Sequence, residues 1–339
     1  MDWIKQIRQK YPNELVLAAI LAGLFCVIGI LSPDQFLSGN NMRSMMFQMS
    51  EFGFIALGMM AVILTGGISL SIVSQAALSS IVGAFILTSP LTQASPIVGI
   101  IAAIAACLIT SAITGAFNAY FVAYLGVAPI LVTLGTMTLF NGISLNFTKG
   151  GAISGFPEAY SVIGNETLLG VPIPILIYVL GVIVSYFLLE RSAWGTEVYM
   201  IGCNETASRF SAINTRKALL KVYVFSGLMA GISGIIMSSR YNSAKSDYGS
   251  SYVMQSVAAV VLGGTRISGG HGTVAGTVLA VCIIQIVSSG LNILGVNRYV
   301  VDIVIGGILL VVLSIRMLFG KGKRLSLPIR KKRAAKKVS

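Results

Sequence analysis

Apolar residues occur along this chain in long runs, separated by short clusters of Gly, Pro, Ser and Asn. A helix that crosses a bilayer needs about 20 apolar residues, so the longer runs predict membrane-spanning helices. Ten spans are predicted, at residues 15–31, 42–65, 75–88, 96–124, 128–147, 173–189, 219–239, 252–262, 273–294 and 299–317. We therefore expect an all-α, polytopic membrane protein with one transmembrane domain over 15–319.

Composition supports this class. Hydrophobic residues make up 55% of the chain, charged residues 10%, and the mean hydropathy is +0.86, which excludes a water-soluble domain. No small-residue cleavage pattern follows the first apolar run, so it is expected to be an uncleaved span. Three of the four cysteines lie inside apolar runs, so no disulfide framework is predicted.

Basic residues predict the orientation, because Lys and Arg near span ends are retained in the cytoplasm. Lys5, Arg8 and Lys10 precede the first span, and residues 321–337 are rich in Lys and Arg without an acid. The N-terminal segment 1–14 and the basic tail 320–339 are therefore expected to be cytoplasmic. The tail could contact anionic membrane lipid. Nucleic-acid binding is not expected, since this short basic surface is also needed for topology.

A polar segment, residues 190–221, lies between the sixth and seventh spans and is therefore predicted to be cytoplasmic. Such a segment between spans predicts contact with a soluble partner that supplies energy. The chain has no GxxxxGK[ST] phosphate loop, so any ATP and Mg²⁺ are expected to be used by a separate subunit and no cofactor is bound directly. The single histidine, His271, has no Cys or carboxylate neighbours in the sequence, so no metal site is predicted.

Two predicted spans are short and adjoin glycine-rich breaks, at residues 65–74 and 262–273. Broken helices are tolerated in a membrane only when protein or a wet cavity covers them, and in transporters they point to the solute pathway. Alternatively, the glycines only permit close helix crossing, as expected for the pairs Gly227, Gly231 and Gly272, Gly276. We favour this alternative for the second break and leave both interpretations open for the first.

The predicted external segments 150–172 and 241–251 are too polar to cross a bilayer and too long for simple turns. They are interpreted either as a docking surface for an external partner or as ordinary surface loops.

Two acids fall within predicted spans, Asp302 near a helix start and Glu51 about 12 Å into its helix. Intramembrane carboxylates are costly and often functional. Glu51 could serve a secondary carrier coupled to protons, which is the competing functional class. A neutral, hydrogen-bonded Glu51 is the other interpretation.

Four stretches together carry a family resemblance over about residues 15–317: TGGISLSIVS (65–74), LVTLGTMTLF (131–140), GTEVYMIGCNETASRFSAI (195–213) and AAVVLGGTRISGGHGTVAGT (258–277). The chain resembles the permease subunits of bacterial ABC importers for monosaccharides, the ribose-type family. The first stretch, for example, is similar to the family's GGIDLSVGS.

The resemblance implies a non-enzymatic subunit of the inner membrane that imports a small sugar-like solute such as autoinducer-2, ribose or rhamnose. It implies a homodimeric or heterodimeric channel between an extracytoplasmic solute-binding protein and two cytoplasmic ATPase subunits. Residues 195–213 would contain the coupling helix that contacts the ATPase. The expected coupling residues are Gly202, Cys203, Asn204, Glu205 and Arg209, and the expected pathway residues are Ser69, Ser71, Ser74, Thr133, Thr136 and Glu51.

The chain departs from the family pattern where carboxylates are expected. Ser69 replaces the common Asp, Val73 replaces a Gly, and Val253 and Gln255 replace an acidic pair. Because carboxylates are strong acceptors for sugar hydroxyls, these changes indicate a different or less demanding substrate, or the specialised half of a heterodimer. The stretches GFPEAY, LLGVPIPILI and YNSAKSDYGSSYVMQSVAAVVLGG resemble one of the two permease subunits of heterodimeric autoinducer-2 importers.

Overall fold

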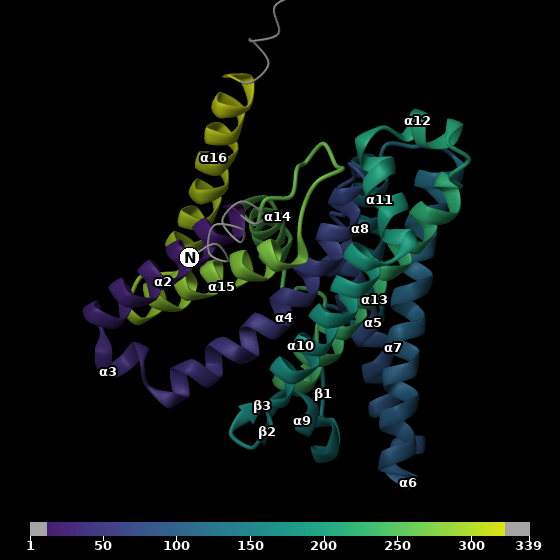
Figure 1. Cartoon of the computed structure of the whole chain (residues 1–339). Helices are drawn as coiled ribbons and strands as arrows, with labels where there is room; N and C mark the ends of the chain where they lie inside the picture. Colours follow the sequence, from purple (N-terminus) through teal and green to yellow (C-terminus); the bar gives the residue numbers. More distant parts are fainter. Residues whose placement is uncertain (1–11, 323–339) are drawn as a thin grey trace, which may run out of the picture.

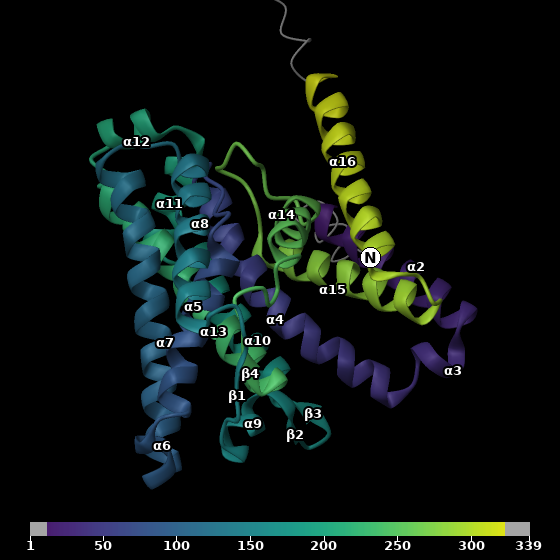
Figure 2. The same ribbon diagram turned by 180° about the vertical axis from the view of Figure 1, so that it is seen from behind.

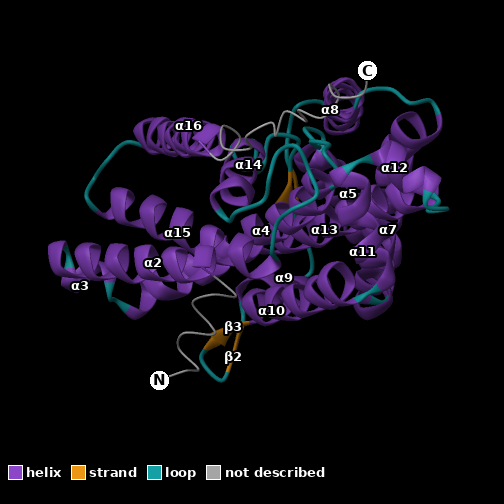
Figure 3. Ribbon diagram, turned by 45° about the horizontal axis from the view of Figure 1, so that its top comes forward, coloured by secondary structure: helices purple, strands orange, loops and turns teal. Residues whose placement is uncertain are grey.

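The computed structural model describes residues 12–322, which fold almost entirely into helices (Figures 1 and 3). The predicted cytoplasmic segments 1–14 and 320–339 lie largely outside the described residues. In chain order the helices are α2 (Pro12–Leu31), α3 (Pro33–Phe36), α4 (Gly39–Leu64), α5 (Ile72–Leu87), α6 (Pro90–Ala94), α7 (Pro96–Ala119), α8 (Pro129–Thr148), α9 (Glu158–Asn165), α10 (Ile173–Tyr186), α11 (Ala193–Cys203), α12 (Glu205–Phe210), α13 (Thr215–Tyr241), α14 (Tyr252–Leu262), α15 (Val274–Ile293) and α16 (Arg298–Gly322). Two π-helical turns, η1 (Tyr120–Tyr124) and η2 (Phe187–Arg191), extend α7 and α10.

The predicted spans are confirmed as helices. Among residues 12–322, seven helices are long and apolar enough to cross a membrane, while α5, α14 and the apolar part of α16 are shorter. The start of α13 differs from the prediction, because it begins at Thr215 inside the polar segment 190–221. Asn214 explains the difference: its side chain accepts a hydrogen bond from the Lys217 amide at 3.1 Å, which caps the helix so that it begins four residues before the apolar run.

Helices α4 and α13 form the centre of the protein, packed against each other and against α5, α7, α10 and α14. In its most apolar window, α4 has 83% of residues buried, whereas α2 has 6%, so the rest of the chain leaves most of α2 uncovered. Figures 1 and 2 show α2 and α15 side by side, next to the N-terminal half of α4.

Glycines allow α13 to cross α7 closely, as predicted for Gly227 and Gly231. A Cβ on Gly227 would overlap the backbone carbonyl of Ser111 in α7, and a Cβ on Gly231 would overlap the Ser111 side chain. The second predicted pair does not lie on one helix. Gly272 is in the loop before α15, where a Cβ would overlap the Thr265 side chain, whereas Gly276 lies on α15 and packs against the backbone of Gly263 at the end of α14.

The two ends of the protein carry different secondary-structure elements (Figures 1 and 2). One end carries α11 and α12. The opposite end carries α6, α9 and the short strands β1 (Ile153–Ser154), β2 (Thr167–Leu168), β3 (Val171–Pro172) and β4 (Ser243–Ala244). β2 and β3 form a hairpin, and β1 pairs antiparallel with β4, so the two predicted external segments are joined to each other.

Helix α9 was not expected within the predicted loop 150–172. It is fixed against the end of α13, where helix carbonyls lack partners within the helix. The Asn165 side chain donates to the carbonyls of Ser239 at 3.2 Å and Arg240 at 3.3 Å, and the Ser239 hydroxyl donates to the Tyr160 carbonyl at 2.6 Å. These contacts join residues more than 70 positions apart, so the local sequence pattern does not reveal them.

Candidate functional site

The first break is the loop 65–71 between α4 and α5. Two neighbouring helices hold it in place. The Ser71 hydroxyl accepts hydrogen bonds from Gln75 Nε2 at 3.0 Å and from Asn118 Nδ2 of α7 at 2.8 Å. Thr133 of α8 donates to the Ile68 carbonyl at 2.9 Å. The loop is therefore anchored by polar side chains inside the protein.

Five of the predicted pathway residues lie at this break. Ser69, Ser71 and Thr133 are fully buried, and Ser74 and Thr136 are nearly so. Within residues 12–322, the Oγ of Ser69, the Oε1 of Gln75 and the Oδ1 of Asn118 are buried without a hydrogen-bond partner. Polar atoms left unpaired inside a protein are costly, so they normally receive hydrogen bonds from water or a bound polar molecule.

Glu51, the sixth predicted pathway residue, lies elsewhere. It is thirteen residues before the end of α4, or about 20 Å along the helix. Its fully buried carboxylate forms a salt bridge with Arg240 at 3.0 Å and accepts hydrogen bonds from the Tyr252 hydroxyl at 3.1 Å and the Tyr241 hydroxyl at 3.4 Å. These contacts tie α4 to the end of α13 and the start of α14.

The second break is the loop 263–273 between α14 and α15, and it contacts the first directly. The Gly270 amide donates to the carbonyl of Leu64, the last residue of α4, at 2.9 Å. Gly269 and Gly270 have φ values of +83° and +72°, which L side chains rarely adopt. The loop therefore needs glycine at these positions to bring its backbone against the end of α4.

Gly202, near the end of α11, lies against both Leu64 and Gly270. A Cβ on Gly202 would overlap the Leu64 carbonyl and the Gly270 amide, and a Cβ on Gly269 would lie 2.9 Å from the Gly202 Cα. We call these backbone contacts among Gly66, Gly202, Gly269 and Gly270 the glycine junction. It joins the predicted coupling segment to both helix breaks, and Figure 1 shows the loop after α14 reaching toward α11.

Two side chains reinforce the glycine junction. The Tyr199 hydroxyl donates to the Gly272 carbonyl at 2.8 Å. Burial, together with the nearby Glu190 carboxylate, raises the pKa of Tyr199, so the phenol keeps its proton and remains a donor. Cys203, another predicted coupling residue, places its Sγ 3.6 Å from the Gly270 carbonyl.

The predicted coupling segment is divided into two helices at Asn204. Asn204 has an extended backbone, and its side chain accepts a hydrogen bond from the Ala207 amide at 3.0 Å, which starts α12. Glu205 and Arg209 pair on α12 at 2.6 Å, and Arg209 Nε donates to Thr215 at 3.2 Å. These predicted coupling residues are exposed and fix α12 against the start of α13.

Two of the predicted coupling residues meet the first break at a cavity of about 340 Å³, which none of the predicted pathway residues lines. Thr65 and Gly66 of the first break line it together with Glu205 and Arg209 of α12. The cavity therefore gives the coupling segment and the first break one shared space beside the glycine junction.

Three functional candidates were missed by sequence reasoning. Asn118 and Gln75 are amides within apolar runs, which is a detectable signal for a polar role. Phe210, at the end of α12, is 88% exposed although it is a large aromatic side chain. The sequence alone does not show that this ring points outward, away from the rest of the chain.

Comparison with known proteins supports a transport role. The family model described as "Branched-chain amino acid transport system / permease component" matches residues 41–313. The Autoinducer 2 import system permease protein LsrD of Yersinia enterocolitica is 35% identical over 317 residues, which cover 90% of this chain and 92% of the relative. LsrD of Photorhabdus temperata is 33% identical, over 90% and 91% of the two chains.

No solved structure gives a significant match. The family supplies the membrane component of importers whose ATPase and solute-binding protein are separate partners, so this subunit is not itself an enzyme. With the apolar helices, the family also identifies a multi-pass protein of the inner membrane. The family model and both relatives cover most of the sequence, and the chain therefore belongs to the ribose-type family of ABC importer permeases.

Proposed function

We propose that the chain forms one half of a heterodimeric channel that imports autoinducer-2 or a closely similar sugar-like solute. A separate ATPase would use ATP and Mg²⁺, and an extracytoplasmic binding protein would deliver the solute. The names of the relatives support the solute. The glycine junction carries the mechanism, because it connects the segment that would contact the ATPase to both helix breaks.

In the proposed orientation, the end that carries α12 faces the cytoplasm. Of the 24 Lys and Arg residues, only Arg43, Lys149, Arg240, Lys245 and Arg298 fall at the opposite end of the spans. The other basic residues lie in the termini, in 190–221 or near the start of α15 and the end of α16. This asymmetry is the one expected for cytoplasmic segments.

Closure of the ATPase would move α11 and α12, and the glycine junction would pass this motion to the breaks. Backbone atoms in direct contact cannot yield by changing side-chain rotamers, so a shift of Gly202 must displace Leu64 or Gly270. The start of α15 would follow, since the Glu190 carboxylate accepts a hydrogen bond from the Val274 amide at 2.7 Å.

The solute is tested by uptake into proteoliposomes that hold the full importer: this chain, its second permease subunit, the ATPase and the binding protein. We expect ATP-dependent uptake of labelled autoinducer-2 that a tenfold excess of ribose or rhamnose does not suppress. Suppression by either sugar would reassign the solute, and absence of any ATP-dependent uptake would contradict the proposed function.

Phe210→Ala is expected to weaken ATPase binding by about 30-fold, the effect of losing an interface residue worth roughly 2 kcal/mol. The amount of permease in the membrane should not change, because the ring is 88% exposed. Binding of the purified ATPase to the permease pair measures the effect. Leu169→Ala, which removes a 98% exposed side chain from the β2–β3 hairpin, is the control and should bind normally. Equal binding by both variants would exclude Phe210 from the interface.

Ser69→Leu is expected to lower uptake more than tenfold while ATP hydrolysis stimulated by the binding protein continues. Ser69 is fully buried at the first break, and a larger apolar side chain would fill the polar space around it. Ser69→Ala is the control for folding, because it removes an unpaired hydroxyl without adding volume. Wild-type uptake by the Leu variant would remove the first break from the pathway.

A further inference from the structure

A second polar cavity, of about 290 Å³, lies among α4, α14, α15, α16 and the end of α13. Nine of its eleven lining residues are polar. The helices contribute residues far apart in the chain, including Gln48, Tyr252, Gln255, Ser288, Asn292 and Asp302. Its volume is near the lower end of the range of roughly 300–1,000 Å³ found for ligand pockets, which suits a small solute.

The cavity reaches into the membrane-spanning part of the protein from the side opposite α12. Gln48 is about 14 Å along α4 from its start, and Gln285 is about 12 Å along α15 from its end. Their side chains are paired, with Gln285 Nε2 donating to Gln48 Oε1 at 3.0 Å. Polar groups well inside membrane-spanning helices are expected to face a water-filled space and to mark solute pathways.

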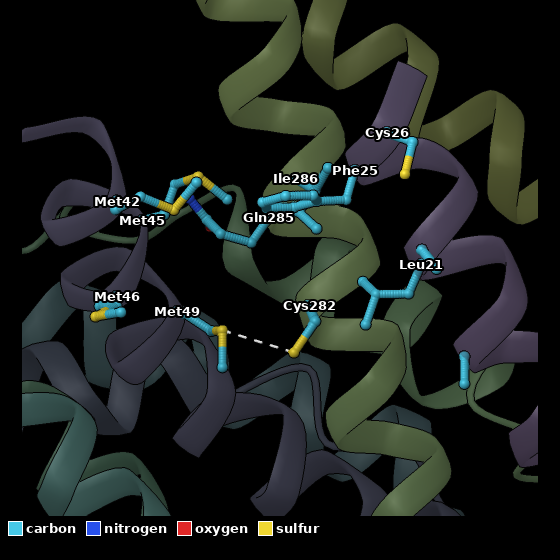
Figure 4. Close-up of a pocket in the computed structure, with 12 residues that line it drawn as sticks. Leu21, Phe25, Cys26, Met42, Met45, Met46, Met49, Cys282, Gln285 and Ile286 are labelled. Carbon is cyan, nitrogen blue, oxygen red and sulfur yellow. Dashed lines mark hydrogen bonds between the residues drawn. The ribbon is translucent and has the colours of Figure 1, made fainter. Parts of the chain in front are cut away.

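A neighbouring cavity is lined almost entirely by apolar side chains, in contrast to the polar cavity. The apolar cavity, of about 430 Å³, lies between α2, α4 and α15, and Gln285 lines both cavities. Figure 4 shows the methionines of α4 converging on it, with Met49 in contact with Cys282 at 3.7 Å. The side chains that line the apolar cavity provide almost no hydrogen-bond donors or acceptors. A hydroxylated molecule would therefore be bound by the polar cavity rather than by the apolar one.

The charges around the polar cavity favour a neutral ligand. Its one described cation, Arg240, is already paired with Glu51 at 3.0 Å, and Asp302 adds a carboxylate. No unpaired positive charge is therefore available there to bind a phosphate or carboxylate. The amides of Gln255 and Asn292 both donate and accept, and the Asp302 carboxylate, 3.5 Å from Gln255, is a strong acceptor for hydroxyl groups.

We propose that this polar cavity is a solute-binding site within the permease, which receives a small neutral polyhydroxylated molecule on the external side. The inference rests on the proposed function for the direction of transport. Asp302 would then supply from α16 a carboxylate acceptor next to Gln255, the position where the sequence lacks the family's acid.

Ser288→Phe tests the site by filling it. In proteoliposomes with the full importer, we expect uptake of labelled autoinducer-2, and of labelled D-ribose if it is transported, to fall more than tenfold. ATP hydrolysis stimulated by the binding protein should persist and show that the complex assembles. Ile109→Phe, at a 59% exposed position on α7, is the matched control and should transport normally.

Gln255→Leu makes a smaller change that keeps the test valid if Ser288→Phe fails to assemble. Loss of one hydrogen bond to the solute should lower uptake several-fold, up to about tenfold. Normal uptake by either assembled variant would overturn the proposed site. If the wild-type importer transports ribose but not autoinducer-2, the proposed solute is wrong. In that case, loss of ribose uptake in both variants would still support the proposed site.

Discussion

Gly202→Ala is expected to lower ATP-driven uptake more than tenfold while the chain remains folded in the membrane. The added methyl group would overlap the backbone of Leu64 and Gly270, and backbone atoms cannot move aside as a flexible side chain can. Such overpacking costs roughly 1–3 kcal/mol, enough to shift the balance between two conformations of the permease. Uptake and ATP hydrolysis by the reconstituted importer, measured together, give the result.

The matched control is Gly135→Ala in α8, where an added Cβ has no atom within 4 Å. Alanine also has a higher helix propensity than glycine, so this variant should be at least as stable as the wild type and transport normally. If Gly202→Ala also transports normally, the close packing at the glycine junction has no part in coupling.

Removal of Arg240 by substitution with Met is expected to destabilise the folded permease by about 3–5 kcal/mol, because the fully buried Glu51 carboxylate loses its ion partner. The Arg240 side chain also lies over the rings of Phe47 and Tyr241, so some packing is lost with the charge. Thermal unfolding of the purified permease pair in detergent should show a lower transition temperature.

The double variant Glu51→Met, Arg240→Met separates a structural role from proton coupling. With both charges removed, stability should return most of the way toward the wild type, and the ATP-driven uptake that remains should not respond to a protonophore. A proton carrier that depends on Glu51 would lose transport in this variant. Wild-type uptake that a protonophore abolishes, together with no uptake by the stable double variant, would favour the carrier over the structural role of the ion pair.

The helices were predictable because the bilayer imposes a strong constraint on composition and length. The start of α13 was less predictable, since the Asn214 cap lies in a polar stretch that also reads as a loop. Helix α9 depends on contacts between Asn165 and carbonyls at the end of α13, about 75 residues away, which leave no periodic pattern.

The candidate site was predicted in part. Serine and glycine near Ser69 and Gly66 indicated a break, and the family resemblance singled out Gly202. That Gly202 touches the end of α4 and the second break could not be predicted, because backbone contacts between distant residues carry no side-chain signal. Asn118 was missed because a single amide in an apolar run does not reveal which hydroxyl it binds.

The most direct test of the central claim compares two energy sources in proteoliposomes. With ATP inside, the full importer should accumulate autoinducer-2, and a protonophore should leave the rate unchanged. The purified chain alone, under an imposed proton gradient, should move no solute. Uptake by the chain alone that follows the proton gradient would contradict the account of an ATP-driven permease coupled through α11 and α12.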